Sequence, residues 1–116
     1  MIVEQRTYKI RNGCMARYLQ LVRDEGLPIQ GPILGNLIAY FTTEIGPLST
    51  VTHLWGFADL NDRTLRRKQL AGDKRWQAFI PQLSELIEQA ENRILVPTEF
   101  SPLREMPPGA ASPAAQ

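Results

Sequence analysis

Residues 51–76 read VTHLWGFADLNDRTLRRKQLAGDKRW and decide the fold, because they join an apolar strand to a charged helix. Successive side chains of a strand point to opposite faces, so the first residues of this stretch place four alternate side chains on one face. These are Val51, His53, Trp55 and Phe57. Asp59 and Asn61 follow, and their side-chain oxygens are of the kind that caps helix N-termini. The stretch therefore predicts a buried strand and then a helix that runs from Asp59 to Gly72.

The N-terminal residues 2–10 alternate in the same way and predict another strand. Glu4, Arg6 and Tyr8 then share one face. Charges in a sheet must be paired or must face a wet cavity, because an unpaired buried charge is very costly. Two interpretations stay open: a Glu4–Arg6 ion pair or dimer contact that only holds the structure, and a pocket that binds a ligand.

Between these two strands the chain predicts a helix, a connection and a hairpin. The helix carries an apolar stripe of Met15, Tyr18, Leu19 and Val22 and is expected to end at Gly26 and Pro28. Residues 27–35 are expected to be irregular or briefly helical. Residues 36–44 predict a strand, 45–49 a turn, and Thr50 the start of the strand quoted above, so the two strands should pair antiparallel.

The C-terminal part predicts a helix, a strand and a tail. Asp73 is placed to cap a helix with apolar residues at helical spacing: Trp76, Phe79, Ile80, Leu83, Ile87 and Ala90. Pro81 lies inside that pattern and predicts a kink or a break. Residues 93–100 predict the last strand, with Pro97 disturbing its ladder. Residues 105–116 are rich in Pro and Ala and predict a tail.

The order strand, helix, strand, strand, helix, strand predicts an α+β fold, a ferredoxin-like βαββαβ subunit over residues 1–104 with helices on one face of the sheet. Both faces of the strand 36–44 carry apolar residues. Leu37, Ala39 and Phe41 alternate with Ile38 and Tyr40. A second covering layer is required, and we expect a homodimer formed through the sheet face that the helices leave open.

The stretch HLWGFADLNDRTLRRKQLAGDKRW resembles the pattern of the NIPSNAP family, and so do EQRTY, GNLIAYFTTEIGPLSTVTHLW and ENRILVPTEFSPL. The resemblance extends to Arg104. The matching residues are Glu4, Arg6, Tyr8, Gly35, Glu44, Gly46, His53, Trp55, Arg63, Arg67, Leu70, Trp76 and Pro97. Phe57 stands where a tyrosine is frequent, and Lys74-Arg75 replace a commoner pair of Pro and acidic residue. The resemblance implies a dimeric α+β barrel and no settled activity.

Composition excludes several classes of function. Thirteen basic and 12 acidic residues give a net charge of +1, which does not suit non-specific nucleic-acid binding. One cysteine and one histidine exclude an internal disulfide and a conventional zinc site, so we expect neither metal nor cofactor. Charges near the N-terminus argue against a signal peptide, and no apolar run is long enough to cross a membrane. A cytoplasmic protein is the expectation.

The candidate site residues each have a functional and a structural interpretation. His53 is a weak candidate for a general acid or base, or a hydrogen-bonded structural histidine on an apolar face. Trp55 and Trp76 can stack on a planar ligand or pack in the core. Arg63 and Arg67, four residues apart, can bind an anion together, or lie on a solvated helix face or pair with Asp59, Asp62 or Asp73.

Two classes of function remain. The first is the binding of a small organic ligand, anionic or carbonyl-bearing, in a pocket between sheet and helices, with or without cofactor-free catalysis. Its ligand-binding candidates are Glu4, Arg6, Tyr8, His53, Trp55, Arg63 and Arg67. The second is a non-catalytic protein–protein interaction module. An enclosed cavity lined by polar residues favours the first, and a filled core with internally satisfied charges favours the second.

Overall fold

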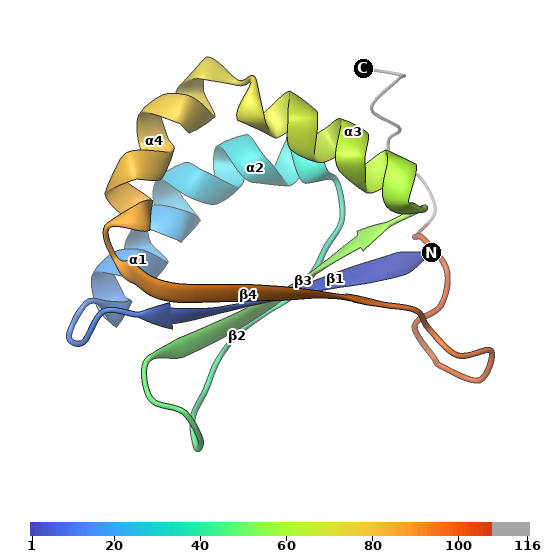
Figure 1. The fold of residues 1–116 in the computed structure, drawn as a ribbon, viewed down its shortest axis with the longest axis horizontal. Coiled ribbons are helices and arrows are strands. Elements are labelled where there is room, and N and C mark those ends of the chain that lie inside the picture. The colour runs from blue at the N-terminus through green and yellow to red at the C-terminus, as the bar shows by residue number, and fades with distance from the viewer. Residues whose placement is uncertain (108–116) are drawn as a thin grey trace.

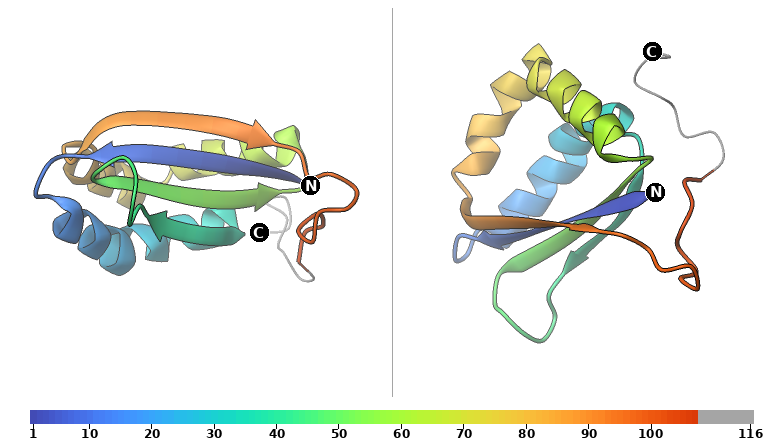
Figure 2. Two further views of the ribbon diagram at one scale, coloured as in Figure 1. Left: turned by 90° about the horizontal axis from the view of Figure 1, so that it is seen from below. Right: turned by 45° about the vertical axis from the view of Figure 1, so that its right-hand side comes forward.

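The computed structural model describes residues 1–107, which form an antiparallel sheet with helices on one face (Figure 1). The strands are β1 (Ile2–Ile10), β2 (Leu37–Thr42), β3 (Thr50–Phe57) and β4 (Ile87–Leu95), in the order β2-β3-β1-β4. Figure 2 shows β1 and β3 side by side at the centre of the sheet. The predicted α+β class and the central position of these two strands are therefore confirmed.

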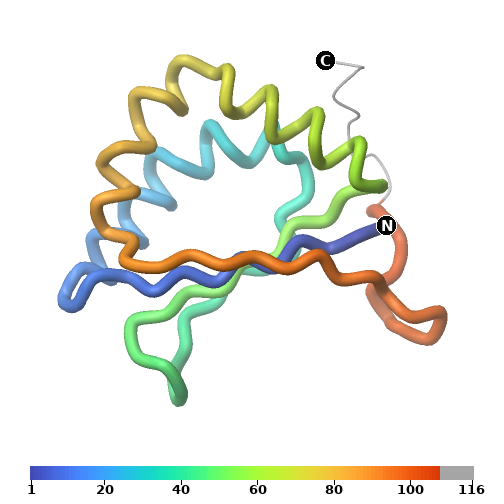
Figure 3. Tube along the Cα trace, in the orientation of Figure 1, coloured from blue at the N-terminus to red at the C-terminus, as the bar shows by residue number. Residues whose placement is uncertain are grey.

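The N-terminal helical region is longer than predicted. It comprises α1 (Met15–Leu21), the π-helical η1 (Val22–Gly26) and α2 (Leu27–Leu34), which follow one another directly (Figure 3). The prediction that the helix ends at Gly26 and Pro28 is wrong, because Gly26 has right-handed helical dihedral angles and Pro28 lies in the first turn of α2. There its missing N–H removes no helical hydrogen bond.

Helix α3 (Leu60–Ala71), which carries Arg63, Arg66 and Arg67, packs beside the end of α2 in the layer over the sheet. It begins as predicted, with the Asp59 carboxylate accepting from the Asp62 N–H at 2.7 Å. From α3, Arg66 reaches the end of α2 and donates to the Ile33 carbonyl at 3.2 Å. The chain leaves α2 at Gly35, whose φ of 90° suits glycine, and a Cβ there would collide with the Arg66 guanidinium.

The last helix and the last strand have other bounds than predicted. α4 (Lys74–Ser84) is capped by Asp73 as expected, and Pro81 lies inside it without a break. The helix does not continue to Ala90, because Ile87 and Ala90 pair with β1 in β4. A short apolar run is compatible with a helix or a strand, and here the backbone groups of these residues form hydrogen bonds with β1. Pro97 lies beyond the end of β4, not within it.

The buried core lies between the sheet and the helices in two clusters that share partly buried neighbours. One comprises Ile10, Tyr18, Leu21, Val22, Val51, Phe79 and Leu83, and the other Ile33, Leu34, Trp55, Phe57 and Leu70. Trp76 of α4 packs against both clusters. No helix within residues 1–107 is long and apolar enough to cross a membrane.

The open face of the sheet is less apolar than the sequence suggested. A bulge between Leu37 and Ala39 interrupts the alternation of side chains in β2. The predicted assignment of alternate residues to opposite faces therefore applies only from Ala39 onward. Phe41 remains on the open face, 56% exposed, but it lies beside Thr52, which in turn faces Thr7 of β1. A second hollow of about 510 Å³ lies here, against Thr7, Lys9, Pro47, Thr50, Gln89, Ala90 and Glu91.

Candidate functional site

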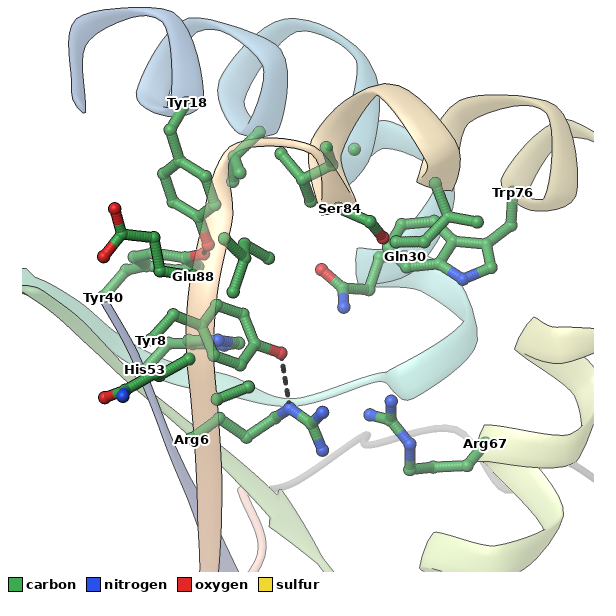
Figure 4. Close-up of a pocket in the computed structure, with 17 residues that line it drawn as sticks. Arg6, Tyr8, Tyr18, Gln30, Tyr40, His53, Arg67, Trp76, Ser84 and Glu88 are labelled. Carbon is green, nitrogen blue, oxygen red and sulfur yellow. Dashed lines mark hydrogen bonds between the residues drawn. The ribbon is translucent and has the colours of Figure 1, made fainter. Parts of the chain in front are cut away.

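A cavity of about 460 Å³ lies between the sheet and the helices. Its polar lining includes Arg6, Tyr8, Gln30, His53, Arg67 and Glu88, and its apolar lining includes Val22, Trp76, Ile80, Leu83 and Ile87. Figure 4 shows the sheet residues Arg6 and Tyr8 on one side and Gln30 and Trp76 of the helices on the other. The volume is in the range typical of small-molecule sites.

Glu4 is a fully buried carboxylate beside this cavity and is shared by several donors. Its Oε2 accepts from Arg6 Nη1 at 3.1 Å, Arg63 Nη2 at 2.6 Å and Asn92 Nδ2 at 2.9 Å. Burial raises the pKa of Glu4, but the hydrogen bonds from Arg63 and Asn92 and the charges of Arg6 and Arg67 outweigh it and hold the pKa at about 2. Glu4 is thus ionised at every physiological pH.

The positive charges around Glu4 exceed its single negative charge. Arg6, Arg63 and Arg67 all lie within 4 Å of Glu4, so the cluster carries two net positive charges. Arg67 is the least compensated, since its Nη1 stays 3.9 Å from Glu4 Oε1, and both atoms are buried without a hydrogen-bond partner in the described chain. Burial and the charge of Arg6 lower the pKa of Arg67. The cluster therefore holds a surplus of positive charge that Glu4 alone does not balance.

His53 is held in one tautomer by its neighbour on the strand. Its Nδ1 accepts a hydrogen bond from Trp55 Nε1 at 2.7 Å, so the proton of the neutral ring lies on Nε2. Burial, together with the charges of Arg6 and Arg67, lowers the pKa of His53 to about 3. The imidazole is a neutral donor at pH 7, and this geometry weighs against its use as a general base.

Three tyrosines form the aromatic side of the cavity. Tyr8 stands edge-on to His53 and accepts from Arg6 Nε at 2.7 Å. Tyr40 stacks on the His53 ring, with ring centroids 4.4 Å apart. The hydroxyls of Tyr18 and Tyr40 are hydrogen-bonded to each other, and burial raises the pKa of both. The phenols of Tyr18 and Tyr40 therefore stay protonated.

The structure brings together most of the candidates from the sequence. Glu4, Arg6, Tyr8, His53 and Arg67 lie at the cavity or directly behind its wall. Trp55 is fully buried in the core, so its packing interpretation applies, and Arg63 holds Glu4 without lining the cavity.

The expectation that Arg63 and Arg67 lie on a solvated face or pair with aspartates is wrong, because both approach the Glu4 carboxylate, while Asp62 pairs with Arg66. Sequence reasoning also missed several polar or aromatic residues of the site: Tyr18, Gln30, Tyr40 and Asn92. Asn92 lies opposite Arg6 in the β1–β4 ladder. It was missed because the predicted last strand began at Arg93, one residue after it. Within residues 1–107, no three His, Cys, Asp or Glu side chains are grouped to hold a metal ion.

Comparisons with known proteins agree with this fold. NipSnap homolog 2 of Mus musculus is 31% identical over 110 residues, which cover 89% of this chain and 36% of that protein, so the chain spans about a third of its length. A crystal structure of a NIPSNAP family protein from Agrobacterium tumefaciens is 68% identical, with a TM-score of 0.88 over 89% of this chain and 98% of that one.

A more distant likeness concerns the fold alone. A putative antibiotic biosynthesis monooxygenase from Nitrosomonas europaea is 8% identical, with a TM-score of 0.64 over 84% of this chain and 98% of that one. The family model described as NIPSNAP matches residues 3–102. With nearly the whole described chain matched, this protein belongs to the NIPSNAP family.

Proposed function

We propose that this protein binds a small organic anion in the cavity between its sheet and its helices. The observation that carries the proposal is the cluster in which three arginines share the one carboxylate of Glu4. An unpaired buried guanidinium is costly, and Arg67 cannot lose its proton near neutral pH. A bound anion removes that cost, so the cluster is best explained as half of a binding site.

Binding, not catalysis, is the function that these side chains support. The two groups suited to proton transfer by type, His53 and Glu4, have pKa values of about 3 and about 2. A general base works best with a pKa near the working pH. The proposal needs no metal, cofactor, membrane or nucleic acid, and it suits a cytoplasmic protein with a net charge of +1.

A homodimer is the second part of the proposal. The open face of the sheet carries Phe41 and the second hollow, and further exposed apolar residues follow β4, among them Val96 and Phe100. Apolar area of this kind is typical of an interface between copies. The alternative function, a protein–protein interaction module, would use the same surface for another protein.

The matched pair Arg67→Met and Lys68→Met tests the binding function. Both remove one positive charge from neighbouring positions of α3, but Arg67 lines the cavity and Lys68 is exposed. In a thermal-shift screen of small carboxylates and other organic anions, we expect ligands that raise the melting temperature of the wild type and of Lys68→Met but not of Arg67→Met. A broad screen that shifts none of the three, or all three equally, would refute the function and favour the interaction module.

A further inference from the structure

We infer that the anion is an aromatic monocarboxylate, with its carboxylate between Arg6 and Arg67 and its ring against the apolar side of α4. This inference rests on the proposed function and names its ligand class. Two properties of the cavity support it: the directions in which the unused hydrogen-bond donors point, and the apolar side chains on the wall opposite these donors.

The free donors are arranged for a planar group. Figure 4 shows the guanidinium groups of Arg6 and Arg67 pointing toward each other across the cavity. Arg6 uses Nε for Tyr8 and Nη1 for Glu4, and Arg67 Nη1 has no hydrogen-bond partner in the described chain. Because the Tyr8 oxygen accepts from Arg6, its own O–H is left to donate. Guanidinium forks match the two coplanar oxygens of a carboxylate.

The cavity offers little that a phosphate group prefers. Phosphates are commonly held by successive backbone N–H groups at a helix N-terminus. The N-terminus of α4 contributes Trp76 to the cavity, but its backbone N–H groups at Arg75 and Trp76 already donate to the Asp73 carboxylate. Side-chain donors on two arginines therefore provide the recognition, and a carboxylate is the anion they fit.

The opposite wall favours a flat apolar body. Trp76, Ile80 and Leu83 follow one another at helical spacing along α4 and face the cavity. On the sheet side the rings of Tyr8 and Tyr40 line it. A small carboxylate such as acetate would leave this apolar wall in water, whereas an aromatic ring covers it and gains the contact energy of ring–ring and ring–aliphatic packing.

Isothermal titration calorimetry with four probes tests the ligand class: 2-naphthoate, its neutral analogue 2-naphthamide, acetate and inorganic phosphate. We expect naphthoate to bind the wild type and Lys68→Met, and to bind Arg67→Met about tenfold more weakly, as does naphthamide to the wild type, since a charge-assisted hydrogen bond is lost in each case. Ile80→Ala should weaken naphthoate severalfold through lost apolar contact.

The outcomes separate the ligand class from the binding function. If acetate or phosphate binds the wild type as tightly as naphthoate, the aromatic class is wrong and the anion site remains. If none of the anions binds, or if naphthamide binds as well as naphthoate, both fail. The comparison of naphthoate with naphthamide uses the wild type alone, so it tests whether the negative charge is recognised even if Arg67→Met does not fold.

Discussion

The indole N–H of Trp55 donates to Nδ1 of His53, two residues before it on the same strand. Alternation in a strand places such a pair on one face, where the two rings meet edge to face with centroids 6.3 Å apart. The bond occupies the lone pair that an incoming proton would need. Burial and the charges of Arg6 and Arg67 keep the one histidine of the sequence neutral by lowering its pKa to about 3, and this has measurable consequences.

His53 should not titrate in the folded protein at moderately acidic pH. Because its pKa is about 3, the Cε1 proton resonance should keep its chemical shift between pH 8 and pH 5. Since the chain has a single histidine, the signal needs no assignment by mutation. A midpoint between pH 6 and 7 would show that the ring is solvated and that the Trp55 bond is absent.

The same shift predicts how stability depends on pH. The unfolded histidine binds a proton below about pH 6.5, whereas the folded one stays neutral down to about pH 3, so the free energy of unfolding falls as the pH drops through this window. Between pH 6.5 and 5 the loss should be about 2 kcal/mol in urea denaturation. The control His53→Gln should lose much less over this window. Glu4 adds a loss only below about pH 4.5, as its folded pKa is about 2.

The substitution of Gly35 or Gly31 by alanine should have clearly unequal effects on stability. Gly35→Ala adds a Cβ against the Arg66 guanidinium at a positive φ and should destabilise the protein by more than about 2 kcal/mol. Gly31→Ala adds a methyl in α2 that meets only neighbouring residues of the chain, among them Pro32, and should cost clearly less than Gly35→Ala. Chemical denaturation of both variants checks the pair, and equal effects would contradict the packing of Arg66 on the end of α2.

Trp76 should anchor α4 over both core clusters. Trp76→Ala removes the ring that packs against Phe79 at a centroid distance of 5.6 Å, and we expect a loss of about 3 kcal/mol. Trp76→Phe keeps an aromatic ring there and should cost clearly less. Thermal unfolding measures both changes, and a Trp76→Ala transition that barely moves would place the indole on the surface.

The open face of the sheet should form the dimer interface. Light scattering at micromolar concentration should give twice the chain mass, and Phe41→Lys should shift the protein toward the monomer by placing a charge in the interface. Leu65→Lys is the matched control, since Leu65 is similarly exposed but lies on α3, away from that face. A wild-type monomer, or dissociation by the control alone, would rule out this interface.

The positions of Glu4, Arg6 and Tyr8 on one face were predictable from the sequence, whereas Arg63 and Arg67 of α3 were candidates whose partner, Glu4, was not predictable. The fixed period of two in a strand places Glu4, Arg6 and Tyr8 on one face whatever the rest of the chain does. α3 is too polar for an apolar stripe to define its rotation, so which of its arginines would reach Glu4 depended on packing alone. The start of β4 was also missed, because its apolar residues Ile87 and Ala90 continue the helical spacing of the apolar residues in α4.

Gln89 and Ala90 of β4 border both the binding cavity and the hollow on the open face. One edge strand would therefore separate the proposed ligand on one side from the second copy of the proposed dimer on the other. An edge strand held by a partner opens less often, so assembly would lengthen the residence time of the ligand. Dilution below the dimer dissociation constant would then speed ligand release, and exchange kinetics would report on quaternary structure.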